Sequence, residues 1–580
     1  MHRQAWPPKA KEISVSEQFD YIIVGAGSAG GTLAARLTQD GQKTVLLLEG
    51  GGSHKDLLID MPSGWGQMVH SRRYSWGHQT EPEAYAGNRR IDLRRGKRLG
   101  GSSSINGMIY VRGDRSDFDS WAALGARGWS YEEVLPYFVR TQDQQSTAPA
   151  FQQAWHGRGG PLTANDLPAA HPISQAMVQA ACQAGLPHCT DFNNGHPDGS
   201  GLFQVNIKNG KRSSIARNAI EPAMQRSNLK VQLHALVTRI GLEQGRARTV
   251  HWQDAAGGQH SATARQEVLL CAGALQSPQL LLLSGIGPAQ HLQAMGIPVA
   301  QELPGVGANL QDHAIVPMSW RMHPGTPSLN RSLRGIGIVA ALAQYMLQRK
   351  GPMAMPASEF AAWFSSDPTL PYNDLQIHGL PVTGDIEAFV RDGKTYRTEA
   401  FPGMTMAPYQ VRPYSRGHLQ LRSPHAQDLA RVQMNYLHDE RDRQALLHGM
   451  RMAMRIAQQP ALAGMVLTQT RPGPDLRSDA ELLDWAAMYL GSGHHASGSC
   501  RMGDVADPMT VVTPDLKVKG VEGLRVIDAS VMPHLVSGNT NAASVVIGDK
   551  GADLVLGLAP PVVRASPEAS APTPAALAVS

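Results

Sequence analysis

The feature that most constrains the fold is an apolar strand that runs directly into three glycines and then a helix, between Asp20 and Leu37. Gly25 permits a tight turn, Gly27 lets the backbone approach a pyrophosphate, and Gly30 lets the helix pack close to the strand. The N-terminus of such a helix faces the phosphates, which its N–H groups and dipole stabilise. The stretch predicts a dinucleotide-binding unit of the Rossmann type.

A second apolar strand, 44–49, ends in Glu49, about 20 residues beyond the last glycine, where a carboxylate accepts ribose hydroxyls. An acidic residue here disfavours the 2′-phosphate of NADP. A glycine-rich turn alone can be only a turn, but here strand, helix, second strand and acidic residue agree. The pattern does not separate NAD from FAD.

Composition excludes several classes of protein. The chain has 580 residues, 42% hydrophobic and 17% charged, which is typical of a globular protein of roughly three to four units. The net charge of +5 is small and the basic residues are scattered, so no nucleic-acid partner is expected. No apolar run approaches the roughly 20 residues that span a bilayer, and the first residues lack the apolar core of a signal peptide. We expect a cytoplasmic protein, with any contact at the inner membrane made from its surface.

The cysteines give no sign of a disulfide scaffold or of a metal site. They are few and irregularly spaced, and none forms the CxxC pair typical of zinc. We therefore expect reduced thiols and no metal. The four are Cys182, Cys189, Cys271 and Cys500.

A second strand-to-helix unit lies far along the chain, where a strand over 267–271 leads into an apolar helix. Ser277 is expected as the N-cap of this helix, with Pro278 at its first position and Gly285 at its end. A further strand is predicted over 229–240 from alternating apolar residues. Two such units so far apart imply one nucleotide-binding sheet assembled from distant segments.

We therefore expect an α/β fold, with a Rossmann-like domain assembled from discontinuous segments and a substrate domain built on an antiparallel sheet flanked by helices. Residues 18–317 would form the nucleotide-binding region with inserted loops and helices, and 318–480 mainly the substrate domain. Residues 481–556 would return to the first domain. Residues 1–17 are interpreted as a polar arm, and 559–580, rich in Ala, Pro and Ser, as a mobile tail.

Three helices have clear patterns: 131–140 with Ser130 as N-cap, 441–459, and 542–556. The first is expected to be structural. The last begins beside a polar segment, and its N-terminal dipole could stabilise negative charge on a bound cofactor. Between 96 and 113, two adjacent glycines precede three serines, a pattern that suits a phosphate or the polar edge of a planar ring but also occurs in flexible loops.

Several of these segments together resemble the glucose-methanol-choline (GMC) oxidoreductase family, flavoenzymes that oxidise alcohols. The resemblance runs from about Phe19 to Leu556. It is carried by motifs in separate parts of the chain: the glycine cradle with Glu49, the 100–106 stretch with its two glycines and three serines, 273–287, 304–313, 495–503, and 538–541.

The resemblance implies that the nucleotide is FAD. Glu49 would hold the adenosine ribose and the backbone of Val237 would meet the adenine. Asp528 and Ala529 would lie against the cofactor from the C-terminal side. Some family members attach the flavin through a histidine in the glycine-serine loop, where this chain has Ile105, so a dissociable FAD is expected. The remaining residues that the resemblance assigns to the cofactor are Gly25, Gly27, Ser28, Gly30, Gly101, Ser102, Asn106, Gly107, Met108, Ile109, Asn539 and Thr540.

Alcohol oxidation requires a base for the hydroxyl proton while a hydride leaves for the flavin N5, and a neutral imidazole has a suitable pKa. Among 22 histidines, His495 matches the base of the family's motif, with Ser499 in place of the usual threonine; the adjacent His494 is the alternative. Asn539 matches the second member of the catalytic pair. Its amide can hydrogen-bond the substrate oxygen but cannot act as a base.

The substrate is less well defined by the sequence. The pattern resembles the choline dehydrogenase-like bacterial branch, and recognition of choline needs a carboxylate and aromatic side chains. Glu359 is the nearest carboxylate, but its spacing to Phe364 is one residue off the choline pattern. We therefore expect an uncharged primary alcohol, with choline as the second alternative.

Two other functions remain open, a hydroxynitrile lyase that keeps FAD without redox use and a non-catalytic flavin-binding module. The intact pair of His495 and Asn539 speaks against the module. The sequence leaves open whether a quinone, another carrier or oxygen accepts the electrons.

Overall fold

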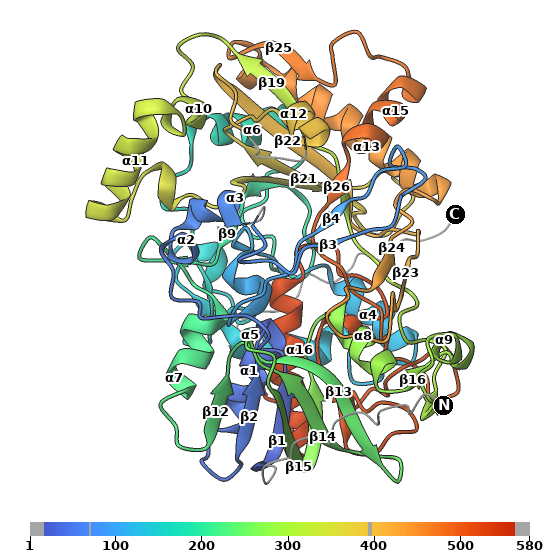
Figure 1. Ribbon diagram of the computed structural model, residues 1–580. Helices are drawn as coiled ribbons and strands as arrows, with labels where there is room; N and C mark the ends of the chain where they lie inside the picture. The colour runs from blue at the N-terminus through green and yellow to red at the C-terminus, as the bar shows by residue number, and fades with distance from the viewer. Residues whose placement is uncertain (1–16, 69–70, 393–396, 563–580) are drawn as a thin grey trace, which may run out of the picture.

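The computed structural model describes residues 17–68, 71–392 and 397–562. The expected arm, except for residue 17, and the tail beyond residue 562 lie outside this part of the chain. The described residues build two main sheets, one in the lower and one in the upper half of Figure 1.

The lower sheet has the strand order β12-β2-β1-β15-β14-β13, with β27 paired to β15. Its strands are β1 (Glu17–Val24), β2 (Val45–Leu48), β12 (Leu229–Gln232), β13 (Leu236–Glu243), β14 (Arg246–Gln253), β15 (Gln259–Leu270) and β27 (Leu524–Val526). β14 is antiparallel to both of its neighbours, and the other pairs are parallel. Residues 21–24 pair with residues 45–48, and all eight are buried, as expected for parallel strands covered on both faces.

The chain does not run straight through 229–240, so the prediction of one strand there is wrong. β12 ends at Gln232 and β13 begins at Leu236, at the opposite edge of the sheet. Between them, the N–H of His234 donates to Gly51 O at 3.0 Å and that of Ala235 to Glu49 O at 2.9 Å. These bonds draw the segment across the end of β2, with His234 at a φ of 55°.

Three helices stack beside this sheet: α1 (Ser28–Leu37), α16 (Asn541–Leu556) and α5 (Tyr131–Thr141). α1 packs on α16, and α16 packs on α5. A Cβ at Gly548 would lie 2.4 Å from the carbonyl oxygen of Ala29, so the first pair needs this glycine. Ser130 forms the predicted N-cap of α5, in a capping box with Glu133.

The helix after β15, α8 (Gln276–Leu283), begins earlier than predicted, with Leu275 as its N-cap. Ser277 lies inside the helix, fully buried, and its hydroxyl donates to Asp528 Oδ2 at 2.6 Å. The prediction of Ser277 as N-cap is therefore wrong, because a distant carboxylate binds its side chain. Gly285 follows the helix in the left-handed region, at a φ of 79°, as its predicted terminator.

The upper sheet is antiparallel, with the order β25-β19-β22-β21-β20-β8, and β18 joins β22 to β26. Its strands are β8 (Gly199–Leu202), β18 (Ala314–Ile315), β19 (Met318–Met322), β20 (Phe360–Phe364), β21 (Leu375–Leu380), β22 (Gly403–Gln410), β25 (Val466–Arg471) and β26 (Gly491–Ser492). This sheet thus takes strands from before and after 318–480. α13 (Glu440–Ala457) and α6 (Pro172–Gln183) pack on it. The predicted fold class, a Rossmann-like sheet from discontinuous segments with an antiparallel substrate-domain sheet, is confirmed.

Two helices extend from the upper half at the left of Figure 1, the short α10 (Leu329–Ser332) and the longer α11 (Gly335–Gln348). Throughout the described ranges, no helix has the length and apolarity required to cross a bilayer. Within the same ranges, no three His, Cys, Asp or Glu side chains come together as a metal site.

Candidate active site

A cavity of about 1450 Å³ lies between the two sheets. Its floor is at the ends of β1, β2 and β15, where Val24, Leu48 and Cys271 line it. His378 and Tyr409 of the upper sheet line its roof. Ligands of open parallel sheets bind beyond the carboxyl ends of the strands, and this volume exceeds the roughly 300–1,000 Å³ of most small-molecule sites. The cavity has room for a large cofactor together with a substrate.

The glycines at the cavity floor leave the backbone bare. A Cβ at Gly25, whose φ is 102°, would lie 2.5 Å from Cys271 O, and one at Gly30 would lie 2.0 Å from Gly25 O. Gly27 has no atom within 4 Å of where its Cβ would be, and a Cβ at Gly101 would lie 2.7 Å from Gly27 Cα. Two glycine backbones thus form one wall that a pyrophosphate can approach, as FAD requires.

Glu49 connects this wall to the second strand. Its Oε2 accepts from the N–H of Ala26 at 3.1 Å and its Oε1 from that of Gly51 at 2.8 Å. Burial raises the pKa of Glu49 to about 7, against the lowering effect of these two bonds. Each carboxylate oxygen keeps a lone pair for a ribose hydroxyl.

Two helix N-termini meet at the cavity. Ser28, at the start of α1, donates from Oγ to Asn541 Oδ1 at 2.7 Å, at the start of α16. Both residues line the cavity, as does Thr540, the N-cap of α16. The positive ends of both helix dipoles are therefore directed at whatever anionic group the cavity holds.

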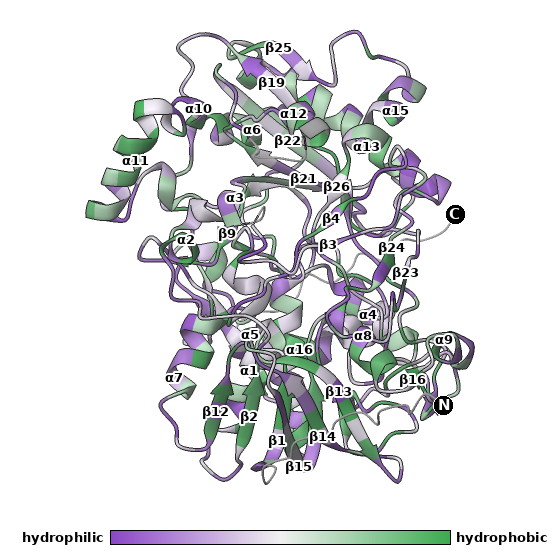
Figure 2. Ribbon diagram, viewed as in Figure 1, coloured by the Kyte–Doolittle hydropathy of each residue, from purple (hydrophilic) through white to green (hydrophobic). Residues whose placement is uncertain are grey.

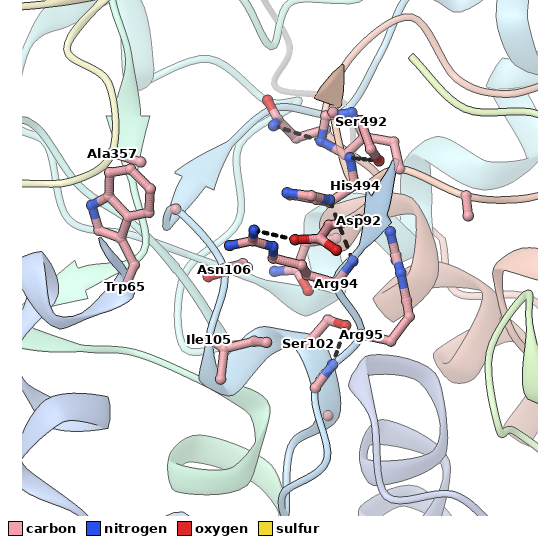
Figure 3. Close-up of a pocket in the computed structure, with 18 of the residues that line it drawn as sticks. Trp65, Asp92, Arg94, Arg95, Ser102, Ile105, Asn106, Ala357, Ser492 and His494 are labelled. Carbon is pink, nitrogen blue, oxygen red and sulfur yellow. Dashed lines mark hydrogen bonds and ion pairs between the residues drawn. The ribbon is translucent and has the colours of Figure 1, made fainter. Parts of the chain in front are cut away.

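The loop with the two glycines and three serines folds into the 3₁₀ helix η2 (Gly101–Ser104). Figure 3 shows Ser102 and Ile105 below Arg94 and Asp92, which form an ion pair at 2.8 Å. Asn106 also lines the cavity. Ile105 lines the cavity and is 3% exposed.

Arg212 holds this loop and was not singled out from the sequence. Its buried guanidinium donates from Nη1 to Asn106 Oδ1 at 2.8 Å and from Nε to Ile59 O at 3.0 Å. Burial lowers the pKa of Arg212 to about 9. Nothing in the local pattern around 212 distinguishes it from a surface arginine.

Asp528 lies deeper in the wall. Its Oδ2 accepts from the N–H of Gly273 at 2.8 Å and from Ser277, while its Oδ1 accepts from the N–H of Ser530. Of the residues assigned to the cofactor from the sequence, only Gly30 does not line the cavity. Those that do are Gly25, Gly27, Ser28, Glu49, Gly101, Ser102, Asn106, Gly107, Met108, Ile109, Val237, Asp528, Ala529, Asn539 and Thr540.

His495 lies at the centre of a chain of hydrogen bonds. Its Nε2 is 3.0 Å from Asn539 Nδ2, and its Nδ1 is 2.9 Å from His313 Nδ1. His313 Nε2 is in turn 3.0 Å from the carbonyl oxygen of Val411. No role was predicted for His313, although it ends one of the family motifs, 304–313.

This chain of bonds fixes one tautomer of each imidazole. Val411 O can only accept, so His313 carries its proton on Nε2 and accepts at Nδ1. The proton between the rings therefore belongs to Nδ1 of His495. The Nε2 of His495 keeps a lone pair, toward which the Asn539 amide donates. The Oδ1 of Asn539 is buried and, within the described residues, has no hydrogen-bond partner.

The electrostatic surroundings keep the imidazoles neutral. Burial above all, with the neighbouring His313, His378 and Arg95 acting in the same direction, holds the pKa of His495 well below 6.5. Burial lowers the pKa of His313 to about 4. At neutral pH, His495 thus has an unprotonated Nε2.

Asp312 positions His495 through the backbone. Its Oδ1 accepts from the N–H of His495 at 2.6 Å, and its Oδ2 from the hydroxyl of Tyr436 at 2.6 Å. Burial raises the pKa of Asp312, while the nearby Arg95 lowers it. Arg95 is partly buried on the cavity wall, and two of its nitrogens are buried without a hydrogen-bond partner within the described residues.

His494 also lines the cavity, but it has a different environment from His495. Its φ of 63° turns the backbone between the two residues. The ring Nδ1 of His494 lies 3.5 Å from the N–H of Arg94, as the dashed line in Figure 3 marks. Only His495 faces Asn539.

The residues present therefore suit FAD: a bare glycine wall for the pyrophosphate, a carboxylate for the ribose, two helix N-termini and a base in one cavity.

The two buried cysteines are not nucleophiles. Burial raises the pKa of Cys271 and of Cys500 well above 9, so both thiols stay protonated at neutral pH.

Comparison with known proteins agrees with this geometry. Residues 19–315 and 413–548 match the N- and C-terminal models of GMC oxidoreductase. Oxygen-dependent choline dehydrogenase of Rhizobium johnstonii is 39% identical over 544 residues, which cover 94% of this chain and 96% of that protein. The enzyme of the same name from Pseudomonas fluorescens is 39% identical, over 94% and 95% of the two chains.

Solved structures are similar as well. Pyridoxine 4-oxidase from Mesorbium loti has a TM-score of 0.81 and 30% identity, over 92% of this chain and 98% of that one. A variant of formate oxidase from Aspergillus oryzae has a TM-score of 0.87 and 25% identity, over 94% and 99%. The chain therefore belongs to the GMC oxidoreductase family, FAD-dependent enzymes that act on CH–OH groups.

Proposed function

We propose that this enzyme oxidises an uncharged primary alcohol to the aldehyde, with His495 as the base. Bound FAD would accept the hydride that leaves the alcohol carbon. The observation that carries the proposal is the unprotonated Nε2 of His495, held in the cavity by His313 on one side and Asn539 on the other.

The side chains have separate tasks. His495 Nε2 takes the hydroxyl proton, while the Asn539 amide orients the alcohol oxygen through a hydrogen bond. The positive N-terminal end of α16, with Thr540 as its cap, stabilises negative charge that develops in the cavity. The glycine wall and Glu49 hold the cofactor in place.

The cavity wall favours an uncharged substrate. Met61, Trp65, Met355, Leu380 and Val382 line it with mainly apolar side chains. An apolar wall of this kind stabilises carbon chains and rings by excluding water from them.

Glu359 is poorly suited to bind a trimethylammonium group. It lines the cavity but is 1% exposed, and its Oε2 accepts from the N–H of His171 at 2.9 Å, at the start of α6. Burial raises the pKa of Glu359, which favours the neutral acid over the carboxylate that a cation needs. Choline remains the second candidate, because Glu359 Oε1 has no partner within the described residues and the relatives include choline dehydrogenases.

We also propose that the FAD is not covalently attached, since Ile105 has no nucleophilic atom to bond with a flavin. The electron acceptor would be a quinone, another carrier or oxygen.

The experiment is anaerobic mixing of the purified enzyme with a series of primary alcohols and with choline. Bleaching of the flavin absorbance by apolar primary alcohols supports the proposal. Bleaching by choline alone, abolished in Glu359→Gln, would favour the second candidate. A flavin that no alcohol bleaches, in an enzyme that cleaves cyanohydrins, would contradict the proposal and indicate a hydroxynitrile lyase.

A further inference from the structure

α11 contacts the rest of the protein along one narrow stripe. Only Ala341 and Tyr345 of this 14-residue helix are buried, where they pack with Met61 and Met353. In Figure 1 the helix stands out from the left side of the molecule.

The side of α11 that faces away from this stripe is apolar. At 100° per residue, the outward positions are those of Ile336, Val339, Ala343, Met346 and Leu347. The exposed fractions are 89% for Ile336, 63% for Val339 and 84% for Leu347. A helix on a protein surface normally has its polar side outward. Figure 2 shows the green of apolar residues along α11, and an exposed apolar surface of this kind marks an interaction site.

The charged residues that flank α11 in the sequence all have the same sign. No Asp or Glu occurs between His313 and Ser358. Two arginines, Arg331 and Arg334, precede the helix, and Arg349 and Lys350 follow it. Among the ion pairs of the described residues, none joins these four cations to a carboxylate. An apolar side with basic residues at both ends is typical of a helix that lies flat in the surface of an anionic bilayer.

We propose that α11 docks this enzyme on the surface of a bilayer that contains anionic lipids, with Ile336 and Leu347 inserted among the acyl chains. The charges argue against a second copy of the chain as the occupant. In a two-fold pair of α11 helices that run antiparallel, Arg331 and Arg334 of one copy would lie against Lys350 of the other. Arg349 is not counted, because its guanidinium lies over the buried ring of Tyr345. Lipid phosphates would neutralise the same residues.

The docked helix would also place the cavity at the bilayer. Leu333, Arg334 and Ile338, just before and in the first turn of α11, line the cavity. An apolar alcohol dissolved in the bilayer would reach His495 along this wall, a consequence that rests on the proposed function. Docking itself does not depend on catalysis, so an experiment can refute the docking proposal without refuting the proposed alcohol oxidation, and the reverse.

The test is co-sedimentation of the holoenzyme with vesicles of phosphatidylcholine and phosphatidylglycerol, and with vesicles of phosphatidylcholine alone. We expect binding to the anionic vesicles that weakens as salt is added. The double variant Ile336→Asp, Leu347→Asp should bind at least about tenfold more weakly, with unchanged flavin content because both side chains are exposed. Val505→Asp, at another exposed apolar residue (56%), is the matched control and should bind like the wild type.

A second variant tests the charges. Arg331→Glu, Lys350→Glu should lose most of the preference for anionic lipid while Ile336 and Leu347 stay in place. Equal sedimentation of the wild type and the Ile336→Asp, Leu347→Asp variant would overturn the proposal. It would also be overturned by a wild-type dimer, seen in light scattering, that this variant dissociates while neither protein binds vesicles.

Discussion

The Nδ1 atoms of His313 and His495 lie 2.9 Å apart in the protein interior. Two imidazole nitrogens at this distance share one proton, and the bond from His313 to Val411 O decides which ring carries it. His313 therefore acts as a positioning residue, which leaves the lone pair of His495 on the nitrogen that faces Asn539.

Replacing His313 tests this role. His313→Leu removes the acceptor for His495 Nδ1–H, so both tautomers of His495 become accessible, and we expect flavin reduction by alcohol to slow by roughly 10- to 10²-fold. His313→Asn keeps a carbonyl acceptor near the same place and should stay within a few fold of the wild type. Anaerobic stopped-flow absorbance measures both rates. Equal slowing in the two variants would mean that His313 only fills space.

The pH dependence follows from the pKa of His495. Because burial holds this pKa well below 6.5, the rate of flavin reduction should be constant from about pH 6.5 upward and fall only at more acid pH. Asn539→Asp places a carboxylate beside Nε2, which raises the pKa of the imidazole. This variant should be slow at pH 6 and recover as the pH rises.

Asn539→Ala is the uncharged control for Asn539→Asp, because it also removes the amide but adds no carboxylate. It deletes one hydrogen bond to the substrate, so we expect at most about a 10²-fold loss with no new pH dependence. A flat profile in Asn539→Asp would contradict the contact between Asn539 and His495.

The glycine wall gives a prediction that separates cofactor binding from folding. Gly27→Ala adds a methyl group where no protein atom lies within 4 Å, so the apoprotein should keep its Tm while the ratio of flavin to protein falls. Gly30→Ala would put a Cβ 2.0 Å from Gly25 O and should lower the Tm or prevent folding. A Gly27→Ala enzyme with full flavin content would show that the pyrophosphate lies elsewhere.

The glycine wall was predictable from sequence because its residues are close together and each has a local steric role. The hydrogen bond between His313 and His495 was not predictable, because the two residues are 182 positions apart in the sequence. The pairing of β18 with β26 and the bridge between Gln311 and Ser497 bring them together. Ser277 shows the same limit: its position fits an N-cap, but Asp528, 251 residues away, binds its hydroxyl.

The helix α11 was not predicted from the sequence, for a different reason. Predictions from sequence patterns rest on the rule that the apolar side of a helix is buried. In α11 the apolar residues Ile336, Val339 and Leu347 are exposed instead. The absence of acidic residues between His313 and Ser358 was the signal that could have identified it.

The flavin should leave the protein on acid precipitation, because Ile105 offers no atom for a covalent bond to it. Absorbance spectra of the supernatant and the redissolved pellet check this. Yellow colour that stays with the polypeptide would contradict a dissociable FAD and require another attachment residue.

The most direct test of the account is the rate of anaerobic flavin reduction in His495→Ala, with His494→Ala as the matched control. Removal of the base leaves the glycine wall untouched, so flavin content should remain near normal while the rate falls by roughly 10²- to 10⁴-fold. His494→Ala should remain within about tenfold of the wild type. Reduction of the His495→Ala flavin at the wild-type rate would contradict the assignment of His495 as the base.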